Sequence, residues 1–172
     1  QNYNKNESNK GFENNDFSDF YLFLLYLANL KNSSSFSAGI DHNSEKLRYA
    51  FPLPSEKPLE PGSYKYTNAN LEFKSDSRKN FLWQAKALTG QYYNGILQQY
   101  SATVSVRKQP WWTVSLLSQY NIIDFPDQYG DTKILLFSPK TEVNFSNKLF
   151  WTTFYQFNTQ ANNFNINSRV QY

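Results

Sequence analysis

Few side chains in this sequence are suited to chemistry. His42 is the only histidine and cysteine is absent, so a Ser-His-Asp triad, a thiolate nucleophile and a histidine-rich metal site all lack their residues. We expect His42 in a solvated turn. Asp124 and Asp127 share a stretch with Pro126 and Gly130, where carboxylates more often shape turns than act as acid and base, and the spacing of an EF-hand loop is absent. We therefore expect no enzyme, no catalytic residue, no metal site and no cofactor.

A tryptophan pair supports two interpretations. Trp111 and Trp112 follow Pro110, where their rings could stack on a sugar. Such a pair is more typical of a strand that enters the interface of a membrane, where aromatic side chains form a belt. We favour the belt and assign Tyr172 to it as well.

Two arginines raise the question of a lumen. Arg107 and Arg169 lie in segments of alternating polarity, in which they would line an interior and favour anions. The alternative is that each arginine pairs with a carboxylate of the wall, such as Glu142 or Glu72.

The composition narrows the class of protein. Across 172 residues the mean hydropathy is −0.69, yet 19% of residues are aromatic. Disorder explains the first value but not the second, whereas a lipid-facing barrel with a polar lumen explains both. The net charge of +3 comes from 17 basic and 14 acidic residues without a block of one sign, so we expect no nucleic-acid partner.

Alternating segments organise most of the chain. We expect residues 1–19 to form a flexible polar leader or loop and residues 51–62 a proline-rich connector. Residues 20–30 fit either a buried helix or a strand that is apolar on both faces, and their aromatic content favours the strand. A short strand is expected around Phe36, Ala38 and Ile40. Regular segments follow at 64–75, 79–92, 96–108, 111–122, 132–145, 147–158 and 162–172, each long enough to cross a bilayer at a tilt.

The alternation assigns side chains to two faces, because successive residues of a strand point in opposite directions. Polar positions are richer in Gln, Asn, Ser and Thr than in charge, which suits a hydrated lumen rather than a soluble surface. The residues predicted to face lipid are Phe81, Trp83, Ala85, Val104, Val106, Trp151, Tyr155, Phe164, Ile166 and Val170. Those predicted to face the lumen are Gln84, Lys86, Ser105, Arg107, Asn165, Asn167 and Arg169.

Several phrases carry a resemblance to a known family. They include "PGSYKY", "SDSRKNF", the step Gly90, Tyr92, Tyr93 and Gly95, and the final stretch from Gln156 to Tyr172 with "NSRVQY". Residues 45–172 resemble the C-terminal barrel region of a Bacteroidetes-type family of large outer-membrane proteins of unknown function. Its members usually carry an N-terminal carbohydrate-binding module resembling family 9, and their chains continue beyond the matching point. The resemblance implies a part of a larger barrel and a glycan ligand bound through regions outside this sequence.

We predict an all-β fold, an antiparallel transmembrane β-barrel spanning residues 20–172, of which seven or eight strands are visible. The expected location is the bacterial outer membrane, with its lipid and other outer-membrane subunits as partners. The expected function is that of a pore, transporter or membrane scaffold. The alternatives are a soluble β-sandwich or lipocalin-like module that binds a ligand, and an accessory subunit of an outer-membrane complex. We expect residues 162–172 to pair with 147–158, and to pair on their other edge with a strand that is absent here rather than with residues 20–30.

Overall fold

The protein is a single antiparallel β-sheet. The computed structural model describes residues 19–52, 57–126, 130–160 and 162–172, and within them it contains nine strands and no helix. The strands are β1 (Asp19–Asn29), β2 (Ser35–Leu47), β3 (Gly62–Lys74), β4 (Phe81–Tyr92), β5 (Gly95–Lys108), β6 (Trp112–Asp124), β7 (Thr132–Asn144), β8 (Phe150–Asn158) and β9 (Asn163–Gln171).

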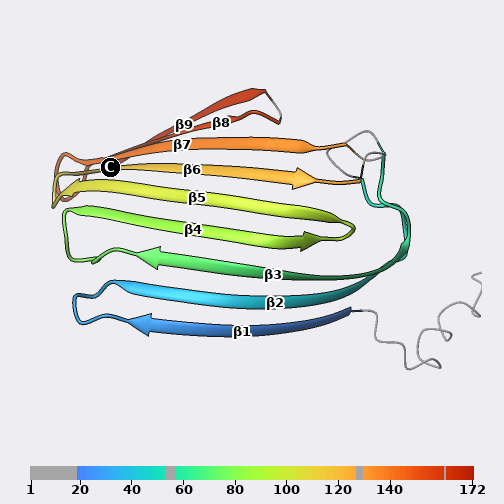
Figure 1. Cartoon of the computed structure of the whole chain (residues 1–172). Coiled ribbons are helices and arrows are strands. Elements are labelled where there is room, and N and C mark those ends of the chain that lie inside the picture. The colour runs from blue at the N-terminus through green and yellow to red at the C-terminus, as the bar shows by residue number, and fades with distance from the viewer. Residues whose placement is uncertain (1–18, 53–56, 127–129, 161) are drawn as a thin grey trace, which may run out of the picture.

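Each strand pairs with its neighbours in sequence, so that the sheet is a meander from β1 to β9 (Figure 1). The seven regular segments predicted from the sequence are confirmed as β3 to β9, and the segment at 20–30 is confirmed as a strand. The short strand expected around Phe36 is wrong in length, because β2 extends through Leu47. Of the leader predicted at 1–19, residues 1–18 lie outside the described residues, and Asp19 begins β1.

The sheet is open. β9 pairs with β8 as predicted, through Phe157 opposite Phe164, and β1 pairs only with β2. Closure of the nine strands into a ring is therefore not observed, and β1 and β9 are the two margins of the sheet (Figure 1).

The connections lie at the two ends of the strands, and each end has its own set. At one edge, which we call the short-turn edge, the connections are residues 30–34, 75–80, 109–111 and 145–149. At the opposite edge, the long-connector edge, the connections are 48–61, 93–94, 125–131 and 159–162. Both long connections share the second edge, where Leu59 of the β2–β3 connection packs with Phe125 of the β6–β7 connection. The described part of the β2–β3 connection extends along this edge (Figure 1).

Candidate functional site: a polar face closed by an aromatic cluster

One face of the sheet, which we call the outer face, is apolar and open. The register places all ten residues predicted to face lipid on this face: Phe81 lies opposite Val106, Trp83 opposite Val104, and Trp151 opposite Val170. Their side chains are largely accessible, with exposed fractions of 56% for Phe81 and 65% for Val170, while Trp151 and Tyr155 are half-buried. The environment that covers this face remains a prediction.

The polar exceptions on the outer face satisfy one another. Thr153 and Ser168 lie opposite each other, with their hydroxyl oxygens 3.0 Å apart, and the Trp151 indole N–H donates to the Ser168 hydroxyl at 2.9 Å. Burying a hydroxyl in an apolar environment costs much less free energy when the hydroxyl is hydrogen-bonded than when it is not. This explains how Ser168 interrupts an apolar strand.

The opposite face, which we call the inner face, is polar through most of the sheet. All seven residues predicted to line a lumen lie on it, since Gln84 pairs opposite Thr103 and Ser105 opposite Ser115. Ser105 donates across to Ser115 at 2.8 Å. Amides also converge on a carboxylate, because Asn43, Asn68 and Asn70 donate to Asp41 at 3.3 to 3.4 Å.

Glu72 and Glu142, the carboxylates considered as partners of the two arginines, pair with other side chains. Glu72 accepts from Gln84 at 2.5 Å and pairs with Lys74 at 3.2 Å. Glu142 pairs with Lys140 at 2.7 Å. In the part of the chain that the structure describes, the ion pairs of these two carboxylates are made by lysines and not by Arg107 or Arg169.

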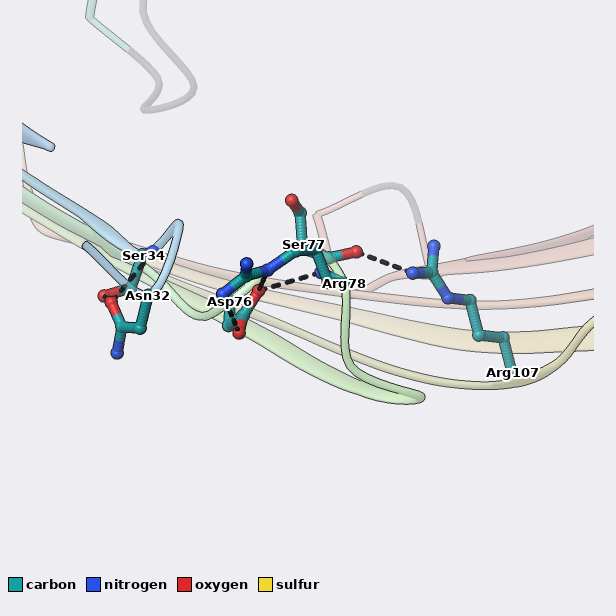
Figure 2. Close-up of polar contacts among 6 residues, drawn as sticks. All are labelled: Asn32, Ser34, Asp76, Ser77, Arg78 and Arg107. Atoms are coloured by element: carbon teal, nitrogen blue, oxygen red, sulfur yellow. Dashed lines mark hydrogen bonds and ion pairs between the residues drawn. The ribbon is translucent and has the colours of Figure 1, made fainter. Parts of the chain in front are cut away.

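The short-turn edge fixes Arg107 instead. Its guanidinium donates to the carbonyl oxygen of Ser77 at 2.6 Å, and in the same turn Arg78 donates to Asp76 at 3.0 and 3.1 Å (Figure 2). These donated hydrogen bonds from Arg78 hold the pKa of the Asp76 carboxyl below its usual value. A smaller contact orders the first turn, where Ser34 donates to Asn32 at 2.6 Å (Figure 2).

The predicted belt residues gather at the short-turn edge. Trp111 lies in the β5–β6 turn, Trp112 begins β6, and Tyr172 follows the last residue of β9. On the outer face, Trp112 lies opposite Val143, which lies opposite Trp151. We call the apolar part of the outer face the apolar zone. Toward the long-connector edge of this zone Tyr100 lies opposite Tyr120, so aromatic side chains flank the zone at both ends of the central strands.

At the long-connector edge the inner face becomes apolar and packed. Leu59, Ile123 and Phe125 are buried there, and Leu47, Tyr64, Tyr92, Tyr93 and Leu97 pack against them; together with Phe51 and Tyr66 we call these residues the mouth cluster. Tyr93 is central, with ring centroids 5.9 Å from Phe51, 5.3 Å from Tyr64 and 4.9 Å from Tyr92. Gly95 permits the approach of Phe125, because a Cβ there would lie 2.7 Å from the Phe125 ring.

Glu45 is the polar centre of the mouth cluster. The hydroxyls of Tyr66 and Tyr93 donate to one of its carboxylate oxygens at 3.3 and 3.1 Å. Burial, and then the charge of Glu45, raise the pKa of Tyr93 above its usual value, so this residue stays a donor. Tyr93 has a φ of 54°, which a bulky side chain rarely adopts, and its ring contacts and hydrogen bond offset that cost.

The two faces exchange character along the strands. Where β3 and β4 carry the mouth cluster on the inner face, their outer face is polar, as Lys65 and Thr67 flank Tyr66 and Gln91 precedes Tyr92. At the same level of β5 and β6 the outer face still carries Ile96 and Ile122. Through the middle of β2 to β9 the inner face is mostly polar and the outer face mostly apolar, whereas β1 is apolar on both faces. The sequence alone did not predict this cluster, although the Tyr92–Tyr93 doublet beside Gly95 and Leu59 in the proline-rich connector were available signals.

The remaining candidates are not assembled into a reactive site. His42 lies within β2, not in a turn as predicted, and its Nδ1 is 2.8 Å from the Thr67 hydroxyl on the outer face. Asp124 ends β6, while Asp127 lies outside the described residues. In the part of the chain that the structure describes, no three His, Cys, Asp or Glu residues form a metal-binding group. The described residues also contain no helix long and apolar enough to cross a membrane.

Comparisons of the chain with known protein families, with curated proteins and with solved structures found no match. The proposals below therefore depend on the geometry of the two faces and of the mouth cluster.

Gly90 gives a first prediction, about how β4 meets β3. A Cβ at this position would lie 2.3 Å from the Thr67 carbonyl oxygen and 2.6 Å from the Asn68 Cα, and the φ of Gly90 is 156°. Since those neighbours are backbone atoms, Gly90→Ala should destabilise the fold by about 1–3 kcal/mol in urea unfolding. Gly62→Ala, whose Cβ would meet only ordinary contacts at 3.5 Å or more, is the matched control and should change stability by less than about 0.5 kcal/mol. Equal effects would contradict the close approach.

Proposed function

We propose that this chain forms part of an antiparallel transmembrane β-barrel in a bacterial outer membrane, serving as a pore, transporter or membrane scaffold. The observation that carries the proposal is the exchange of character between the two faces. A soluble sandwich buries one face along its whole length. Among the described residues, the buried apolar side chains of the inner face lie at the long-connector edge. This fits a barrel wall whose long-connector end projects out of the membrane, while the rest of the wall crosses the membrane and encloses water.

The shape of the apolar zone adds a second argument. One row of paired outer-face residues crosses the sheet from β2 to β9: Phe36, Phe73, Ala85, Ala102, Ser118, Phe137, Phe157 and Phe164. On β2 this row lies at the end of the apolar zone that is nearer the short-turn edge, and the zone continues from Phe36 toward the long-connector edge as far as Ile40. On β9 the same row is its long-connector margin, and the zone continues to Val170. The zone therefore runs diagonally.

A diagonal zone is what tilted strands require. Strands tilted by 35–45°, about 4.8 Å apart and rising about 3.3 Å per residue, keep a constant membrane depth only if the zone shifts by about 1 to 1.5 residues per strand. The short-turn margin shifts from Phe36 to a position level with Val170, which is six residues over seven strand steps. This shift of about 0.9 residue per strand has the expected size to within about a tenth of the lower limit.

The polar inner face suggests what such a wall would do. Amides and hydroxyls line it in the middle of the strands, which suits a hydrated passage, and the mouth cluster folds over it at one end. We propose that the described parts of the β2–β3 and β6–β7 connections, which carry Leu59 and Phe125, narrow that end. The resemblance of the C-terminal stretch to the Bacteroidetes-type family adds the proposal that the passage serves glycan-related binding or transport. A soluble ligand-binding module is the alternative, but within the described residues no second sheet covers the apolar face.

Cysteine labelling tests the proposal. The chain has no cysteine, so Ala85→Cys and Gln84→Cys each introduce a single thiol on adjacent residues of β4 that face opposite ways. A fluorophore on residue 85 should be quenched by nitroxide lipids in liposomes, whereas one on residue 84 should be quenched by aqueous iodide. The reverse pattern would invert the faces. A protein that stays monomeric without detergent and shows iodide quenching at both sites would support the soluble alternative.

A further inference from the structure

The two margins of the sheet expose complete, unprotected strand edges. Among the described residues, Phe20–Asn29 of β1 and the whole of β9 pair with a single neighbouring strand, so that the other side of each carries backbone donors and acceptors outside the sheet ladder. Soluble proteins blunt such edges with proline, lysine or bulges. β1 has only Asp19 as a charged residue and β9 only Arg169, and neither contains proline. Both edges are therefore suited to pairing with another strand.

The direction of the two edge strands restricts their partner. All eight strand pairs are antiparallel, so strands with odd numbers run the same way, and both β1 and β9 run from the long-connector edge to the short-turn edge. Direct pairing of β9 with β1 would be parallel. A second copy inserted into the membrane in the same orientation does not solve this problem, because its β1 would also run parallel to β9.

We propose that the sheet is completed by an element with an odd number of antiparallel membrane-spanning strands, which bridges β9 to β1. This inference rests on the proposed function, because in hydrocarbon every backbone group must be paired. The odd number also gives the even total that bacterial outer-membrane barrels have.

β9 and β1 require different side chains on the strands of that element that pair with them. On the inner face β9 presents Asn163, Asn165, Asn167 and Arg169, so the strand beside it should be polar toward the lumen. On the same face β1 presents Tyr21, Phe23, Leu25 and Leu27, which are between 42% and 62% exposed. The strand beside β1 should therefore be apolar on both faces. The bridging element is expected to change character across its width.

Strand-addition variants test the parity. The full chain is extended after Tyr172 with a short turn and one, two or three further strands copied from β4 onward, the last of them with its inner-face positions changed to leucine or valine, and each form is refolded into liposomes. Closure is measured by heat-dependent gel mobility and by a disulfide between Leu24→Cys in β1 and a cysteine facing it in the last strand. The forms with one or three added strands should close, whereas the unextended chain and the form with two added strands should not.

The outcomes separate the two proposals. Closure of the unextended chain or of the two-strand form, or no closure in any form that inserts into lipid, would overturn the parity inference while leaving the membrane barrel intact. Failure of every form to insert, measured by full digestion with protease added outside the liposomes, would instead overturn the proposed function.

Discussion

Placing an arginine at Val104 should destabilise the protein folded in a bilayer by about 2–4 kcal/mol, because a charged side chain at mid-membrane depth faces hydrocarbon there. Val104 lies on the outer face near the middle of β5, between Trp83 on β4 and Leu116 on β6, and it is 39% exposed. The measurement is urea unfolding of Val104→Arg in liposomes, followed by tryptophan fluorescence.

The adjacent residue supplies the control. Thr103 points to the inner face, between Gln84 and Leu117, so Thr103→Arg places the same charge at the same depth but toward the proposed lumen. This variant should lose less than about 1 kcal/mol, as substitutions on a hydrated surface usually do. If the two variants lose equal stability, the outer face does not meet lipid and the barrel proposal fails.

The strands and their faces were predictable because both follow from local alternation. Residues two apart share a face whatever lies beyond it, so Phe81, Trp83 and Ala85 could be grouped from sequence alone. The all-apolar segment at 20–30 was assigned to a strand on its aromatic content, and β1 confirms this. What alternation does not contain is the number of strands that a ring requires, which depends on partners at both edges.

The mouth cluster was not predictable by the same means. Leu59 lies in a connector with four prolines, and its contacts with Ile123 and Phe125 join segments about sixty residues apart. Such contacts leave no periodic signal. His42 was misplaced for a related reason, because its polar neighbours Asp41 and Asn43 resemble a turn although they are the inner-face positions of a long strand.

The mouth cluster should depend most strongly on Leu59, which is fully buried in the connector between β2 and β3. Leu59→Ala should remove about 2–5 kcal/mol of packing free energy, because it deletes buried apolar atoms and leaves a cavity among Ile123, Phe125 and their neighbours. The connector is otherwise fixed near this point by paired backbone hydrogen bonds between Phe51 and Leu59, at 3.0 and 2.8 Å. Those two amides therefore report on whether the cluster holds.

Hydrogen exchange of Phe51 and residue 59 measures the effect in the protein folded in detergent or lipid. Exchange should accelerate by about 30-fold to a few thousand-fold, since each 1.4 kcal/mol corresponds to a factor of about ten. The amides of the central strands should keep their protection, because their ladders and outer-face contacts do not involve Leu59. Tyr49→Ala changes a residue of the same connector that is 83% exposed, and it should leave both exchange rates unchanged. If Leu59→Ala behaves like Tyr49→Ala, the connector is not held to the inner face by this cluster, and the proposal that it narrows the mouth of a barrel loses its support.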